Sequence, residues 1–138
     1  MKISSAVHSS DGQFLVTLTT NENSHNLTIP PKPSGFGCSV NGGELLFLAL
    51  ATCYCNDIYR EAAKRGIRVK QVEVQAAGEF GAEGEPATNV TYRARVSAEA
   101  TEAEIRDVMN HTDRVSEIQN TIRAGISVTL SSVEAVSL

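Results

Sequence analysis

Tryptophan is absent from this chain of 138 residues, and all aromatic residues together make up only 5% of it. The chain therefore offers few side chains that could stack on nucleic acid bases or sugar rings. Basic residues are also scarce, since 12 stand against 16 acidic residues and the formal net charge is -4. A protein that binds nucleic acid usually needs a basic face, so we expect no nucleic acid partner.

Long apolar runs and cysteine pairs are also lacking. No apolar run reaches the roughly 18 residues of a membrane-spanning helix, and the first ten residues lack the apolar core of a secretory signal, so no membrane association is expected. The three cysteines are an odd number, and Cys53 and Cys55 lack the second cluster that a zinc site requires. We therefore expect free thiols in the reducing cytoplasm, with no metal and no cofactor.

The length and an apolar content of 41% are typical of a single globular domain over residues 1–138. The first part of this domain is rich in strand patterns. Asp11 and Gly12 lie between two such stretches and predict a hairpin turn, and residues 25–29 predict a third strand. The segment 30–43 that follows is rich in proline and glycine and predicts a loop.

A long central helix is predicted from about Gly43 to Arg65. Asn41 and Glu44 have the spacing of an N-cap residue and its capping-box partner, and Gly66 is a typical helix stop. The first half of this helix is apolar on every side, so we expect it to be buried on nearly every side. A helix of about 23 residues is about 35 Å long, which is too long for a single chain of this size to surround. We therefore expect a second copy of the chain to cover it.

The second half of the chain contains two strands, two helices and a last strand. Residues 68–76 and 89–96 alternate between apolar and polar and predict a hairpin. A capping box beginning at Thr101 opens a helix to about His111, and a third helix, capped within 112–113, closes at Gly125. Residues 126–136 return to a strand pattern. The predicted order is β-β-β-α-β-β-α-α-β, which is the α+β class.

Residues 42–53, GGELLFLALATC, resemble the start of the central helix of the OsmC/Ohr family (osmotically inducible protein C and organic hydroperoxide resistance protein). Residues 62–67, 72–74 and 116–122 also resemble this family. The resemblance implies an intertwined homodimer with two long central helices wrapped by antiparallel sheets. It also implies reduction of organic hydroperoxides with a thiol reductant, a small hydrophobic substrate at the dimer interface, and Cys53 as the peroxidatic cysteine.

Three groups that active members of this family use have no match here. Their first-strand arginine is missing, since no arginine precedes Arg60, and Gly43 stands where their catalytic glutamate would be, leaving the neighbouring Glu44 as a weak candidate. Their second cysteine is replaced by Ser116 or by Asp113, depending on which end of the last helix is aligned. Whether the chain is an enzyme is therefore open.

Within one chain the remaining cysteines are not placed to replace the missing one, which leaves the partner's Cys38 or an external thiol. Cys55 lies about 200° around the helix from Cys53, and Cys38 precedes the helix, about 15 Å away along its axis. Asp57, one turn after Cys53, should raise the pKa of its thiol, and Arg60 could pair with Asp57 or favour the thiolate. Two functions follow: a redox protein that acts through Cys53 with an external thiol, or a non-catalytic dimer that binds a small apolar ligand.

Overall fold

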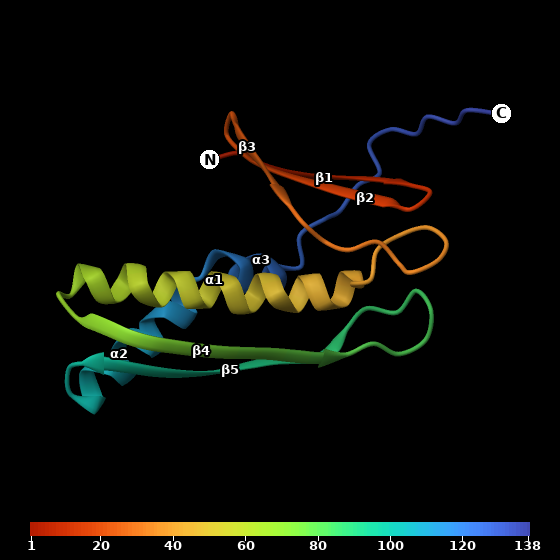
Figure 1. Ribbon diagram of the computed structural model, residues 1–138. Coiled ribbons are helices and arrows are strands. Elements are labelled where there is room, and N and C mark those ends of the chain that lie inside the picture. Colours follow the sequence, from red (N-terminus) through yellow and green to blue (C-terminus); the bar gives the residue numbers. More distant parts are fainter. The chain divides into compact units, whose positions relative to one another are not determined.

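The computed structural model describes residues 1–138, which form two compact units, residues 1–46 and 47–138. The elements follow one another in the order β-β-β-α-β-β-α-α (Figure 1). This is the α+β class with antiparallel sheets that the sequence predicts. No helix is both long and apolar enough to cross a membrane.

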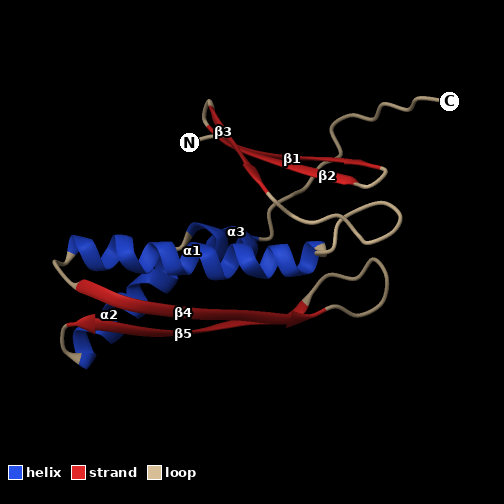
Figure 2. Cartoon of the chain, viewed as in Figure 1, coloured by secondary structure: helices blue, strands red, loops and turns tan.

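The first unit contains a three-stranded antiparallel sheet in the order β1-β2-β3, with bounds Ile3–Ser10, Gln13–Thr20 and Asn23–Leu27 (Figure 2). The predicted hairpin at Asp11 and Gly12 is confirmed: Gly12 has φ +68°, which a residue without a Cβ adopts at no steric cost. The third strand begins two residues before the predicted position. A tight turn with Asn21 at φ +53° brings Asn23 directly opposite Thr20.

The long helix α1 spans Gly42–Lys64, within two residues of the predicted bounds. Its capping box is confirmed, because the Glu44 N–H donates to Asn41 Oδ1 at 2.9 Å and the Asn41 N–H donates to the Glu44 carboxylate at 2.8 Å. Gly66, at φ +68°, turns the chain out of the helix. Its N–H donates to the carbonyl of Ala63, which satisfies one of the last helical acceptors.

In the second unit, α1 packs on one face of a hairpin formed by β4 (Arg68–Glu79) and β5 (Thr88–Glu99) (Figure 1). The strands alternate, so that one face carries small apolar and aromatic side chains and the other carries polar ones. The core is built where this face meets α1 and α2 (Glu102–Val115). It contains Tyr54, Ile58, Ala62 and Val108.

The helices α2 and α3 (Glu117–Ala124) meet at Ser116. The predicted capping box of Thr101 is confirmed, and Gly125 closes α3 in the left-handed conformation, as predicted. The predicted end of α2 near His111 and a cap within 112–113 are wrong. The Thr112 hydroxyl donates to the Val108 carbonyl inside the helix, and the Ser116 N–H donates to Thr112 O, so α2 continues through this region.

The predicted strand at 126–136 is not formed. Its apolar side chains are exposed, with Val128 97% and Leu130 83% accessible. The alternating pattern is present, but a strand also requires a neighbour that pairs with its N–H and C=O groups. No strand of the same chain pairs with this segment.

The apolar first half of α1 is only partly covered within one chain. Leu46 and Leu48 remain 38% and 56% exposed, so this half is not buried on nearly every side within one chain. The physical reason is the one anticipated from the helix length: a single chain of this size does not supply enough surface to cover a helix that is apolar all round.

Candidate functional site

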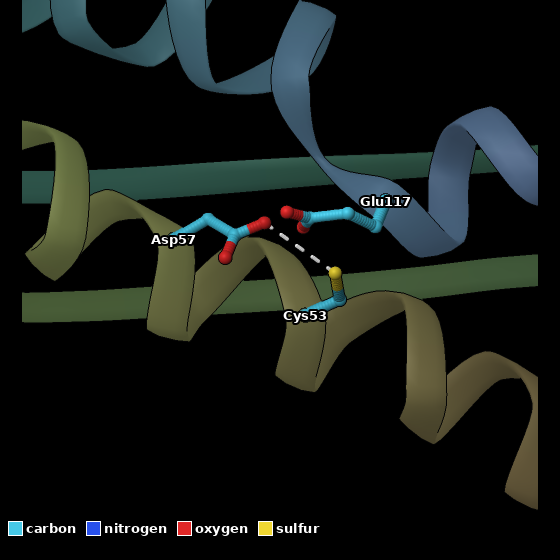
Figure 3. A group of neighbouring side chains, drawn as sticks. All are labelled: Cys53, Asp57 and Glu117. Atoms are coloured by element: carbon cyan, nitrogen blue, oxygen red, sulfur yellow. Dashed lines mark hydrogen bonds between the residues drawn. The ribbon is translucent and has the colours of Figure 1, made fainter. Parts of the chain in front are cut away.

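Cys53 lies on the face of α1 that turns toward the start of α3 (Figure 3). Its thiol donates a hydrogen bond to Asp57 Oδ2 at 3.4 Å, one helical turn further along α1. The backbone N–H of Ile118, in the first turn of α3, faces the same sulfur and favours its thiolate. The sulfur therefore has the Asp57 carboxylate as a proton acceptor and a polar N–H group close by.

The pKa of the Cys53 thiol is raised above its ordinary value. Burial is the largest cause, and the charges of Asp57 and Glu117 add to it, while the N–H of Ile118 opposes both. The predicted effect of Asp57 is thereby confirmed. The resting sulfur is a protonated thiol, although attack on a peroxide requires a thiolate.

Arg60 connects the carboxylates around this site. Its guanidinium lies 2.9 Å from Asp57 and 3.2 Å from Glu117, and its Nε donates to Glu61 at 2.8 Å. The pairing with Asp57 is one of the two roles that the sequence suggests for this arginine. Its positive charge is paired with these carboxylates, and Arg60 is not among the groups that lower the pKa of Cys53.

Glu61 is a buried acid that no sequence pattern indicates as a site residue. Its carboxylate accepts from Lys64 at 2.8 Å and from Arg60, and His111 Nε2 lies 3.3 Å away. The hydrogen bonds from Lys64 and Arg60 lower the pKa of Glu61 to about 2. Glu61 therefore holds Arg60 in place next to the Cys53 site.

Glu117 is the residue of α3 whose side chain approaches Cys53 (Figure 3). The two residues considered for the second-cysteine position lie elsewhere. Ser116 is fully buried and its hydroxyl donates to Thr112 O, while Asp113 accepts from Tyr92 and from Arg123. The sequence signal for Glu117 was only its place immediately after Ser116.

Glu44, the weak candidate for an acid, serves as the capping-box partner at the start of α1. Its carboxylate accepts the N–H of Asn41, and it belongs to the first compact unit, whereas Cys53 belongs to the second. These contacts give Glu44 a structural role in starting the helix.

All three cysteines are free thiols. Cys55 points away from Cys53, as the helical geometry predicts, and lines a cleft of about 300 Å³ together with Val72 and Val74 of β4. Cys38 lies in the first unit, where its thiol donates to the carbonyl of Val40 at 2.8 Å.

Cys53, Asp57 and Glu117 bring one sulfur and two carboxylate oxygens within 4.8 Å of one another. Such a donor set is close enough to surround a divalent cation. However, Arg60 already supplies positive charge to both carboxylates, and the sulfur retains its proton. We therefore assign no metal to this cluster.

The comparison with a family pattern and the comparison with solved structures indicate the same protein family. The pattern of the family "OsmC-like protein" matches residues 35–131. An OsmC-like protein from Mycoplasma pneumoniae aligns over 88% of this chain and 86% of its own, with a TM-score of 0.60 at 15% identity. An OsmC-like protein of unknown function from Vibrio cholerae aligns over 88% and 93%, with a TM-score of 0.59 at 17% identity.

The organic hydroperoxide resistance protein OsmC from Legionella pneumophila aligns over 89% of this chain and 90% of its own. The TM-score is 0.57 and the identity 18%, so this likeness shows the fold alone. A comparison with curated protein sequences finds no match. The family pattern covers more than two thirds of the 138 residues, and the chain belongs to the OsmC-like protein family.

Proposed function

We propose that this protein reduces organic hydroperoxides through Cys53, with an external thiol that regenerates it. The observation that carries the proposal is the position of the Cys53 sulfur, between the Asp57 carboxylate and the N–H of Ile118. The family supports it, because the Legionella pneumophila relative is described as an organic hydroperoxide resistance protein and a predicted redox protein. The reducing cytoplasm is the compartment that such a thiol requires.

The reaction has two steps. Attack of the sulfur on the peroxide converts the thiol to a sulfenic acid, and a second thiol then condenses with it to a disulfide. The α2 and α3 helices contain no cysteine, and Cys55 lies on another face of α1, beside Val72 and Val74 of β4. The second thiol is therefore proposed to be external, and a small thiol or dithiol reductant fits this role.

The protein is further proposed to act as a homodimer in which α1 contacts its copy. Leu45, Leu48, Thr52, Cys55 and Tyr59 follow one another at intervals of three and four residues along α1, and we name them the α1 stripe. Leu48 is 56% and Tyr59 45% exposed within one chain. Alternating steps of three and four residues are the spacing with which two helices pack along a common seam. A small hydrophobic substrate would enter at this interface.

The direct test measures consumption of cumene hydroperoxide with dithiothreitol or a lipoyl-type dithiol as reductant. The expected result is turnover by the wild type and by Cys38→Ser, and none by Cys53→Ser. Cys38→Ser is the matched control, since it removes a free thiol that precedes α1 and donates to the Val40 carbonyl. Equal rates for the wild type and Cys53→Ser would refute the proposal.

A non-catalytic dimer that binds a small apolar ligand is the second candidate. The observation that favours it is the raised pKa of Cys53, which burial and the nearby acids impose. The cleft beside Cys55, with Val72 and Val74 in its wall, offers an apolar surface for such a ligand. The same assay separates the two candidates, because this one predicts no hydroperoxide consumption with any dithiol.

A further inference from the structure

Asp57 is placed to exchange a proton with the Cys53 sulfur. It is 5% exposed, its Oδ2 accepts the thiol hydrogen at 3.4 Å, and its Oδ1 lies 2.9 Å from Arg60 Nη1. The arginine restrains one oxygen of the carboxylate. The other oxygen is directed at the sulfur (Figure 3). A buried carboxylate in this geometry is a candidate general base for the thiol.

We propose that Asp57 carries the proton of the Cys53 thiol to the oxygen that leaves during hydroperoxide reduction, an inference that rests on the proposed function. The sulfur forms a bond to the terminal oxygen of the peroxide and the O–O bond breaks. Asp57 accepts the thiol proton as this occurs and returns it to the alkoxide, which leaves as an alcohol. The sulfur loses two electrons and becomes a sulfenic acid, and the peroxide gains them.

This relay explains how a protonated thiol at this position can react. A free thiolate is disfavoured there by burial and by the two acids, so the proton must move during the attack. The alkoxide is a poor leaving group unless it receives a proton. A single carboxylate in contact with the thiol hydrogen can serve both needs in sequence.

Glu117 does not have the same geometry. Its side chain is 66% exposed, it interacts with its own backbone N–H, and it makes no hydrogen bond to the sulfur. Its charge raises the pKa of the Cys53 thiol. Glu117→Gln therefore removes one negative charge near the sulfur without removing the proton acceptor.

Four groups face the Cys53 sulfur or its acceptor. Asp57 and Arg60 approach from α1, and Glu117 and the N–H of Ile118 approach from α3. Arg60 is in turn held by Glu61, which also contacts Lys64 and His111. Asp57 is the member of this set that contacts the thiol hydrogen.

The test compares Asp57→Asn with Glu117→Gln, using two oxidants that differ in their leaving group. Cumene hydroperoxide releases an alkoxide, which needs a proton, whereas peracetic acid releases a carboxylate, which does not. Oxidation of Cys53 is followed by rapid quenching and peptide mapping. In Asp57→Asn the rate with cumene hydroperoxide should fall about 100-fold, the usual size of a general acid–base contribution. The rate with peracetic acid should fall much less, because its carboxylate leaves without a proton and only the loss of the base for the thiol remains.

Glu117→Gln should react with both oxidants at least as fast as the wild type. The relay is wrong if Asp57→Asn reacts with cumene hydroperoxide as fast as Glu117→Gln does. It is also wrong if Asp57→Asn slows both oxidants equally. Absence of any reaction between wild-type Cys53 and cumene hydroperoxide would instead overturn the proposed function, and the relay with it.

A measurement on the wild type alone covers the case in which Asp57→Asn does not fold. The ratio of the cumene hydroperoxide rate to the peracetic acid rate at Cys53 is compared between the native protein and the protein unfolded in urea. The relay predicts a native ratio about 100-fold higher than the unfolded ratio. Equal ratios in the two states would overturn it.

Discussion

Gln119 of α3 donates from its side-chain Nε2 to the backbone carbonyl of Leu50 in α1, 2.9 Å away. Leu50 precedes Cys53 by three residues and shares its side of the helix. Gln119 is only 2% exposed, and its Oε1 has no hydrogen-bond partner. This bond fixes the start of α3, and with it Ile118 and Glu117, against the part of α1 that carries the thiol.

The Gln119 contact predicts a contrast between two substitutions. Gln119→Ala should lower the free energy of unfolding by about 2 kcal/mol, because it removes a buried hydrogen bond and leaves a cavity. Gln119→Met should cost less than about 1 kcal/mol, since it keeps the volume and removes the unpaired oxygen. Urea unfolding of the two variants measures the difference. Equal losses in the free energy of unfolding would show that stability does not depend on the side-chain volume at position 119.

Gly78 is predicted to be sterically required on β4. A Cβ at this position would lie 2.6 Å from Cζ of Phe47 and 3.1 Å from Cγ2 of Val90. Gly78→Ala should therefore lower the free energy of unfolding by about 1–3 kcal/mol. Gly42→Ala is the control, because nothing lies within 4 Å of its Cβ position at the start of α1, and it should be neutral or slightly stabilising.

Glu61 predicts an acid-sensitive contribution to stability. Its folded-state pKa of about 2 lies below the ordinary value of 4.5, so the folded state favours the ionised form. This stability is fully present above pH 4.5 and is lost as the pH falls toward 2. Glu61→Gln should be less stable at pH 7 and should show a flatter decline over that pH interval. Thermal unfolding from pH 7 to pH 2 checks this, and parallel curves for both proteins would contradict it.

The proposed dimer predicts that a charge on the α1 stripe separates the subunits. Leu48→Glu places a carboxylate on its most exposed apolar member, so light scattering at micromolar concentration should give half the wild-type mass. Ser97→Glu is the control, since this position is exposed on the polar face of β5, and it should leave the mass unchanged. A well-folded wild-type monomer would refute the dimer.

Local sequence patterns predicted those parts of the fold that depend on neighbouring residues. The capping boxes of Asn41 and Thr101, the turn at Gly12 and the stop at Gly66 each require only a few adjacent residues, and all four are present. The segment 126–136 has an equally clear pattern, but its pairing depends on another strand. A pattern within one segment carries no information about that neighbour.

The candidate site also contains residues that local sequence predicts and residues that it does not. Cys53 was indicated by a resemblance of residues 42–53 to a known family, and the effect of Asp57 on it follows from one turn of helix. Ile118 and Glu117 lie near the sulfur only because α3 docks on α1, and the hydrogen bond from Gln119 to the Leu50 carbonyl is part of this docking. Spacing along the chain does not reveal such a contact.

The most direct test of the central claim is the mass of the protein after exposure to excess cumene hydroperoxide without reductant. If Cys53 reacts and has no thiol partner in its own chain, intact-mass spectrometry should show additions of about 16 and then about 32 Da, for sulfenic and sulfinic acid. Peptide mapping should assign them to Cys53, and Cys53→Ser should show neither. A loss of about 2 Da, mapped to a disulfide between Cys53 and Cys38 or Cys55, would contradict the account.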